Sequence, residues 1–250
     1  LTADAAVDPA GRVYFTDARR NRILRIDPDG RIATWRDDSH GSHGVAWGPD
    51  GRLYAGQHDL RRVVAFAADG TEAVVAEGLQ THHLTVTGTG RIYAAAAPLH
   101  RVWLLDGTGP PRIAREGLDW PRGVRQGGHP ERLMVGEPRT PWIWSFRMTA
   151  DGTLDDGLRF CRLETRAGQA GSDAGGLAFD TRGWLYVATE LGVQVCDPRG
   201  RLVGLIGMPG REGASGVFFA GPGLQWLYVT DGERLYRRPV RRRGVVPGRH

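Results

Sequence analysis

A repeated unit constrains the fold of this chain more than any other feature. Residues 42–58 (SHGVAWGPDGRLYAGQH) contain an apolar run, a Pro-Asp-Gly turn and a second alternating run, which is the pattern of a tight β-hairpin. Similar segments occur at 7–17, 85–95, 178–189 and 218–231, with a less regular copy at 124–137. The residues that mark each copy are Tyr14, Tyr54, Tyr93, Met134, Tyr186 and Tyr228, at spacings of 40, 39, 41, 52 and 42 residues.

Each hairpin is followed by a third run, such as RVVAFAADG at 62–70, and then by a fourth, such as EAVVAEG at 72–78. One such sheet cannot bury its own faces and must stack on neighbours, so this period predicts an all-β fold, a six-bladed β-propeller of four-stranded antiparallel blades. We expect one domain over 1–250, with blades at roughly 1–38, 39–78, 79–117, 118–165, 166–210 and 211–246.

The ends of the repeat leave the ring closure open. The last unit takes its fourth strand either from residues 244–246 or from residues upstream of Leu1, and the sequence does not decide between them. Because Leu1 already lies inside a repeat, we expect that an upstream segment was removed or belongs to another domain of the same polypeptide.

Composition narrows the classes of partner. The 33 basic residues are all Arg, so chemistry based on a Lys Schiff base is excluded. The net charge of +5 comes from Arg interspersed with acidic residues, and no nucleic-acid-binding module accompanies it, so we predict no nucleic-acid partner.

No apolar run reaches the roughly 18 to 20 residues that cross a bilayer, so we expect a soluble protein. The compartment stays unknown, with the cytoplasm slightly favoured.

The two cysteines lie in different units and are not spaced like metal ligands. Cys196 sits in an apolar strand, where a buried free thiol is the usual state. We therefore expect a free thiol, and a disulfide to Cys161 remains the alternative.

The repeat also predicts where a site would lie. In a propeller the first strand of each blade starts near the central channel, and the second strand returns to the same face. Residues eleven before the markers should form an inner ring: Ala3, His43, His82 and Gly175, with Arg122 and Gly216 after one extra turn residue. Residues three after the markers, or four in the third unit, should form an outer ring: Asp17, Gln57, Ala97, Glu137, Thr189 and Asp231.

Histidines gather on this face in units two and three: His43, His58, His82, His83 and His100. This clustering indicates a polar pocket that binds a small molecule. His82 or His83 would act as general base, Asp173 would orient it, and Arg122 would hold an oxyanion. The substrate contacts would be His43, Arg122, His58, His100, Glu137 and Ser172. The alternative is an ordinary polar propeller face on which His is merely tolerated.

The residues at 7–17, 22–30, 175–206 and 217–238 resemble the regucalcin, gluconolactonase and luciferin-regenerating-enzyme family of six-bladed propellers. The resemblance covers nearly the whole chain. It implies a divalent metal, usually calcium, in the central channel, and hydrolysis of lactones or related esters.

The metal ligands implied by the resemblance are replaced in this sequence. The family's ligand positions fall on Ala3, His82, Arg122 and Gly175. Calcium prefers oxygen ligands and a guanidinium repels cations, so we expect the calcium site to be lost and predict no cofactor. If a metal binds, imidazoles suit a transition metal, and His43, His82 and His83 would hold it.

Two functions follow from these observations. The first is a divergent lactonase-like enzyme, either a hydrolase or a lyase or isomerase, that acts on a small oxygen-rich or carboxylate-bearing molecule. The second is a non-catalytic propeller that binds a ligand or another protein.

Overall fold

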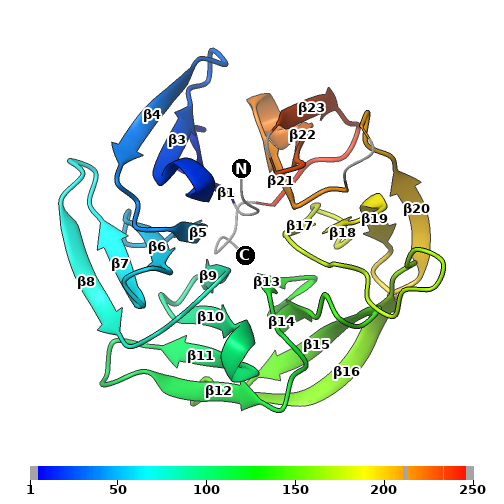
Figure 1. Ribbon diagram of the computed structural model, residues 1–250, viewed down its shortest axis with the longest axis horizontal. Coiled ribbons are helices and arrows are strands. Elements are labelled where there is room, and N and C mark those ends of the chain that lie inside the picture. Colours follow the sequence, from blue (N-terminus) through cyan, green and yellow to red (C-terminus); the bar gives the residue numbers. More distant parts are fainter. Residues whose placement is uncertain (1–4, 211–212, 233, 246–250) are drawn as a thin grey trace.

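The structure is a computed structural model that describes residues 5–210, 213–232 and 234–245. Six antiparallel sheets stand around a central axis like the blades of a propeller (Figure 1). Five sheets have four strands, and the sixth has three among the residues described. The prediction of a six-bladed propeller is therefore confirmed. None of the helices in the described ranges is long and apolar enough to cross a membrane.

The strands follow the chain in order within each blade. Blade 1 contains β1 (Ala5–Val7), β2 (Val13–Asp17), β3 (Arg22–Ile26) and β4 (Ile32–Asp37). Blade 2 contains β5 (Ser42–Trp47), β6 (Leu53–Gln57), β7 (Arg62–Phe66) and β8 (Glu72–Glu77). Blade 3 contains β9 (Leu84–Val86), β10 (Ile92–Ala96), β11 (Arg101–Leu105) and β12 (Arg112–Glu116).

The second half repeats this order. Blade 4 contains β13 (Gly123–Gly127), β14 (His129–Gly136), β15 (Trp142–Met148) and β16 (Leu154–Arg162). Blade 5 contains β17 (Leu177–Phe179), β18 (Leu185–Thr189), β19 (Gly192–Cys196) and β20 (Leu202–Ile206). Blade 6 contains β21 (Gly216–Ala220), β22 (Trp226–Thr230) and β23 (Leu235–Pro239). Short 3-10 helices are η1 (Ala18–Arg20), η2 (Ala97–Leu99) and η3 (Pro222–Leu224).

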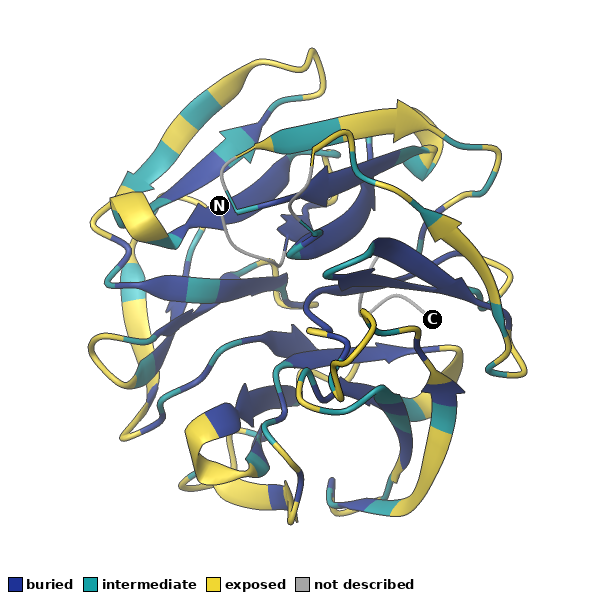
Figure 2. Ribbon diagram, turned by 45° about the vertical axis from the view of Figure 1, so that its right-hand side comes forward, coloured by how far each residue is buried: buried dark blue, intermediate teal, exposed yellow. Residues whose placement is uncertain are grey.

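Burial falls from the axis outward (Figure 2). All five residues of β6 are buried, whereas four of the six in β8 are exposed. Apolar side chains from facing sheets form separate clusters between blades, and the cluster between blades 6 and 1 includes Phe15 and Phe218. Each blade thus stabilises its neighbours, which explains why a single unit would not fold alone.

The marker tyrosines stabilise the hairpin turns. The hydroxyl of Tyr54 donates to the carboxylate of Asp50 at 2.7 Å, and the same carboxylate accepts the backbone N–H of Arg52. The equivalent bonds join Tyr14 to Asp8 (3.3 Å) and Tyr186 to Asp180 (3.5 Å). The repeated Tyr therefore forms a hydrogen bond to the turn carboxylate in addition to packing in the core.

The C-terminal segment does not extend blade 6. Gly244 forms a bridge with Asp180 of blade 5, and the N–H of Val245 donates to the carbonyl of Phe179 at 3.0 Å. Of the two alternatives left open for the fourth strand, the one that uses 244–246 is therefore wrong for residues 244 and 245, and residue 246 lies outside the described ranges. The alternative involving residues upstream of Leu1 stays a prediction.

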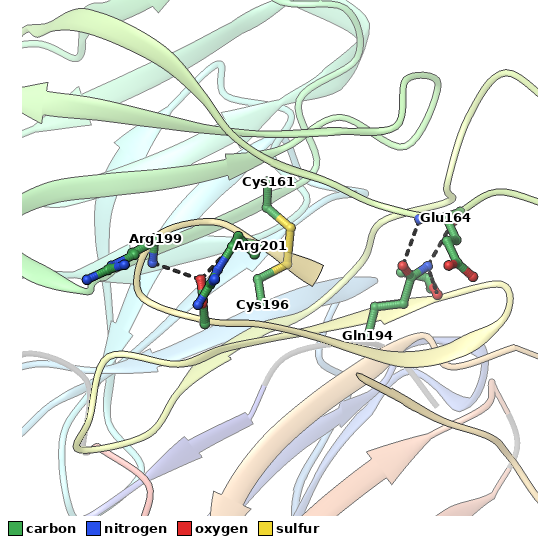
Figure 3. The surroundings of a disulfide bond; sticks show 8 residues. Cys161, Glu164, Gln194, Cys196, Arg199 and Arg201 are labelled. Carbon is green, nitrogen blue, oxygen red and sulfur yellow. Dashed lines mark hydrogen bonds and ion pairs between the residues drawn. A yellow bond between two sulfur atoms is a disulfide. The ribbon is translucent and has the colours of Figure 1, made fainter. Parts of the chain in front are cut away.

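Cys161 and Cys196 form a disulfide between β16 of blade 4 and β19 of blade 5 (Figure 3). The expected free thiol at Cys196 is therefore wrong. Both side chains are fully buried, and their Cα atoms lie 6.7 Å apart across the interface between the blades. The stacking of the blades brings the two residues together although 35 positions separate them in sequence.

Candidate functional site

Two inner-ring histidines meet where blades 2 and 3 approach each other. His43 lies in β5, and His82 comes just before β9. Between them, Gly44 packs so closely that a Cβ atom there would lie 2.7 Å from the carbonyl oxygen of His82. Only glycine permits this approach, so the residue after His43 helps to bring the two imidazoles together.

His58 completes a triangle of imidazoles. The ring centroids of His43 and His58 are 5.1 Å apart, and each lies 5.4 Å from the ring of His82. We call these three side chains the histidine cluster. The structure therefore brings together three of the histidines that the sequence analysis placed on this face.

Burial keeps two members of the cluster neutral. It lowers the pKa of His43 from 6.5 to about 4, with smaller contributions from the charges of His58, His83 and Arg122. It lowers the pKa of His82 to about 3, again with help from the neighbouring imidazoles. Both rings are therefore uncharged near pH 7, which is the form that accepts a proton or ligates a metal.

The hydrogen bonds of the cluster leave capacity for a ligand. The amide nitrogen of Gln80 lies 2.9 Å from Nε2 of His58. Because that nitrogen can only donate, Nε2 of His58 accepts, and its proton resides on Nδ1. In the described structure Nδ1 of His58 and Nδ1 of His82 are buried without a hydrogen-bond partner. Buried polar atoms are rarely left unpaired, so a bound molecule or water is expected to satisfy them.

Arg122 lies near the cluster and forms one side of a separate hollow. Its guanidinium is 3.3 Å from the carboxylate of Asp173. Arg122 and Asp173 line a pocket of about 180 Å³ together with Ser215 and Asp231. Asp173 therefore faces the arginine, not the imidazoles that it was predicted to orient.

His83 is buried next to the cluster, at 2% exposure, and its charge acts on both His43 and His82. The remaining predicted site residues make contacts elsewhere: the Nδ1 atom of His100 lies 3.0 Å from the carbonyl oxygen of Leu118. The hydroxyl of Ser172 donates to the carbonyl of Thr140. The carboxylate of Glu137 accepts the backbone N–H of Asp119 and the indole N–H of Trp144. His100, Ser172 and Glu137 are therefore engaged in local contacts and are not part of the histidine cluster.

The family's calcium does not fit this donor set. Of its four aligned positions, Ala3 lies outside the described residues, His82 offers an imidazole, Arg122 is a cation and Gly175 has no side chain. Calcium needs about six oxygen ligands. Across the described ranges, no three His, Cys, Asp or Glu side chains are arranged to hold a metal ion. The arrangement therefore offers neutral bases and a fixed positive charge.

Two features near the site were not predicted. Gln80 binds His58, but an isolated amide next to a His pair gives no signal in sequence. Trp120 has a left-handed backbone with φ of 62°, and the guanidinium of Arg139 stacks on its ring at 3.8 Å. A bulky residue in that conformation often marks a functional surface, but only the structure reveals it.

Comparison with known proteins points to one group. Residues 112–233 match the family described as "SMP-30/Gluconolactonase/LRE-like region". No curated protein sequence matches the chain. Among solved structures, a gluconolactonase from Xanthomonas campestris is 25% identical, with a TM-score of 0.81 over 95% of this chain and 85% of the other.

Two more structures share the fold at lower identity. Regucalcin from Agrobacterium tumefaciens, a calcium-binding protein, has a TM-score of 0.82 at 13% identity and covers 99% of this chain and 92% of its own. Virginiamycin B lyase from Staphylococcus aureus has a TM-score of 0.68 at 16% identity, over 96% of this chain and 84% of the lyase.

Proposed function

Since residues 112–233 match the SMP-30/gluconolactonase/LRE-like family, we propose that this chain is an enzyme acting on a small, oxygen-rich, carboxylate-bearing molecule. The observation that carries the proposal is the histidine cluster, which holds three imidazoles within 5.4 Å of one another, close enough to Arg122 for its charge to act on His43 and His82. The reaction is a proton abstraction, either from water that attacks a lactone carbonyl or from a carbon next to a carboxylate.

The base in this proposal is His82. Its ring is neutral near pH 7, so a nitrogen lone pair is available, and a negatively charged substrate bound beside the ring would raise the pKa of His82 from about 3 toward the working pH. His43 and His58 border it and would contact the substrate. His58 keeps its proton on Nδ1 through the bond to Gln80, so it can also donate to a substrate oxygen.

Arg122 is the group that binds negative charge. A guanidinium matches the geometry of a carboxylate or an enolate, and it stays charged at every working pH. Asp173 lies 3.3 Å from it and would hold it in place. As negative charge develops on the substrate oxygen, this fixed cation would lower the barrier.

The structures of similar fold support both forms of the proposed reaction, proton abstraction from water and proton abstraction from carbon. A lactone hydrolase and a lyase both occur among the proteins of similar fold. A His→Ala variant of virginiamycin B lyase is catalytically inactive, which is consistent with a propeller enzyme that depends on histidine.

The test compares purified His82→Asn and Arg122→Gln with the unchanged protein on a panel of sugar lactones and enolisable hydroxy acids. We expect His82→Asn to lower kcat by about 100-fold or more, within the usual contribution of a general base. Arg122→Gln should mainly raise KM for carboxylate substrates. Folding is checked by circular dichroism and a thermal melt.

His40→Asn is the matched control. His40 lies on the same side of blade 2 but pairs with Asp38, and its left-handed backbone is tolerated by Asn. It should leave turnover unchanged. Absence of turnover with every substrate, together with carboxylate binding that Arg122→Gln abolishes, would support the non-catalytic binding module instead.

A further inference from the structure

A second pocket lies between blades 4 and 5, away from the histidine cluster. It has a volume of about 380 Å³, within the range of about 300–1,000 Å³ typical of small-molecule sites. Its lining includes the β13–β14 turn at Gly128 and the β19–β20 turn at Pro198. These turns lie at the far ends of strands that begin on the face of the candidate site. This pocket and the candidate site therefore open on opposite faces of the propeller. We call this cavity the blade 4/5 pocket.

Glycines keep the mouth of the pocket open. Gly128 and Gly183 both have left-handed backbones, with φ of 76° and 75°. A Cβ atom at Gly183 would stand 3.7 Å from Pro198 and 3.9 Å from the carbonyl of Gly128, where it would narrow the gap between the two turns. The backbone turns that need glycine thus also leave the entrance without side chains.

The floor of the pocket consists of apolar side chains that are held in place by packing. Met134 and Phe179 contribute to it and are 2% and 6% exposed. Phe160 and Leu158 line the side formed by β16, and Leu158 is 53% exposed. An exposed leucine beside buried aromatic surface would be shielded from water by an apolar ligand.

Positive charge surrounds this floor. Arg132, Arg159 and Arg199 all line the pocket. Of these three arginines, only Arg132 forms an ion pair with a described residue, and its partner is Asp156 at 3.0 Å. The guanidinium of Arg159 stacks over the rings of Trp142 and Trp144, on the side of blade 4 that packs against blade 3, so Arg159 lines the pocket without presenting its charge to it. The pocket therefore presents more positive than negative charge.

Covalent and polar links fix the width of the pocket. The Cys161–Cys196 disulfide joins the residues directly beside Phe160 and Asp197, so it ties the two blades at the pocket wall. Further along the same interface, the side chain of Gln194 forms two hydrogen bonds of 2.8 Å with the backbone of Glu164 (Figure 3). Both links hold the walls at a set distance before any ligand arrives, which lowers the entropic cost of binding.

We propose that the blade 4/5 pocket binds a small amphipathic organic anion, a molecule with a flat apolar body and one carboxylate, sulfonate or phosphate group. The apolar body would lie on Met134, Phe160 and Phe179. The anionic group would lie at the rim, at Arg132 and Arg199. This site is independent of the proposed catalytic function and does not use the histidine cluster.

The experiment uses 8-anilino-1-naphthalenesulfonate as the probe, with the folded, oxidised full chain at low salt. We expect saturable fluorescence enhancement at one site per chain. The double variant Arg132→Gln/Arg199→Gln should weaken the affinity about tenfold, because it removes both guanidinium groups that face the pocket. The uncharged probe N-phenyl-1-naphthylamine should bind both proteins equally.

Arg147→Gln is the control, since Arg147 lies in the same blade but pairs with Asp155 at 2.8 Å outside the pocket. It should leave the affinity within twofold. Absence of saturable binding to the unchanged chain overturns the proposal, as does equal weakening by Arg147→Gln. If Arg122→Gln alone abolishes binding, the anion lies at the candidate catalytic site and the pocket is not its site. Loss of turnover in His82→Asn without loss of probe binding separates the two proposals.

Discussion

At the scale of single residues, burial decides the chemistry that His43 and His82 can perform. Both have pKa values well below 6.5, so each remains neutral in the folded state while its unfolded counterpart takes up a proton. Between pH 6.5 and about 4 the unfolded chain therefore binds more protons than the folded chain, and the free energy of unfolding falls as the pH falls.

We expect the protein to lose about 2 kcal/mol of stability between pH 6.5 and pH 5 from these two residues, after allowing for partial solvation. Urea unfolding at several pH values measures this loss. His82→Asn should roughly halve the slope of stability against pH over that interval. An unchanged slope, or NMR titration of the His82 ring near pH 6.5, would contradict the burial argument.

The turn carboxylates make a second prediction at this scale. Asp180 is 1% exposed and accepts the backbone N–H groups of Arg182 and Trp184 as well as the hydroxyl of Tyr186. Asp180→Ala leaves these donors without an acceptor in a buried turn. We expect it to cost about 1–3 kcal/mol of unfolding free energy in denaturant titration.

The control is Asp69→Ala. Asp69 occupies an exposed turn and accepts the backbone N–H of Thr71, where water can replace it. This variant should lose less than about 0.5 kcal/mol. Equal losses in the two variants would mean that the turn conformation, and not burial, determines the cost.

The site was predictable from sequence only where the repeat fixes position. The register placed His43 and His82 at equivalent points on adjacent blades, and the structure brings them together. It could not predict that Asp173 faces Arg122, because both side chains lie in loops whose course the repeat does not define. It also missed Gln80, since nothing in sequence distinguishes this amide from any other polar loop residue.

At the scale of strands and blades, the alternating runs predicted the sheets well because one face of each strand is buried by a neighbouring blade. The disulfide was not predictable in the same way. Its two cysteines occupy different positions in their blades, one in the fourth strand and one in the third. Their proximity depends on how blades 4 and 5 stack, which the pattern of a single blade does not contain.

Removing this link should weaken the interface between blades 4 and 5. For a loop of 35 residues, the chain-entropy argument gives a loss of about 2–4 kcal/mol for Cys161→Ser/Cys196→Ser. Chemical denaturation of the oxidised protein and of the double variant measures the difference. Dithiothreitol should reproduce the loss in the unchanged chain and have no further effect on the variant. If the unchanged chain is equally stable with and without reductant, the bond contributes no stability.

At the scale of the whole molecule, the ring must close between its first and last blades. The described residues of blades 1 and 6 share no strand, and apolar packing forms this seam. Phe218 of β21 is central to it and is 3% exposed, near Phe15 of β2. Every other junction joins blades that are consecutive in the chain, so a weakened contact there is still held by a short connection.

Phe218→Ala therefore tests how the ring is closed. The cavity should cost about 3–5 kcal/mol. Hydrogen exchange should also accelerate selectively in β1, β2 and β21, because separation of the seam exposes them before the rest unfolds. Phe146→Ala, which opens a comparable cavity between blades 3 and 4, is the control and should accelerate exchange mainly through global unfolding. Uniform acceleration in both variants would show that the seam between blades 1 and 6 is no weaker than the junctions between consecutive blades.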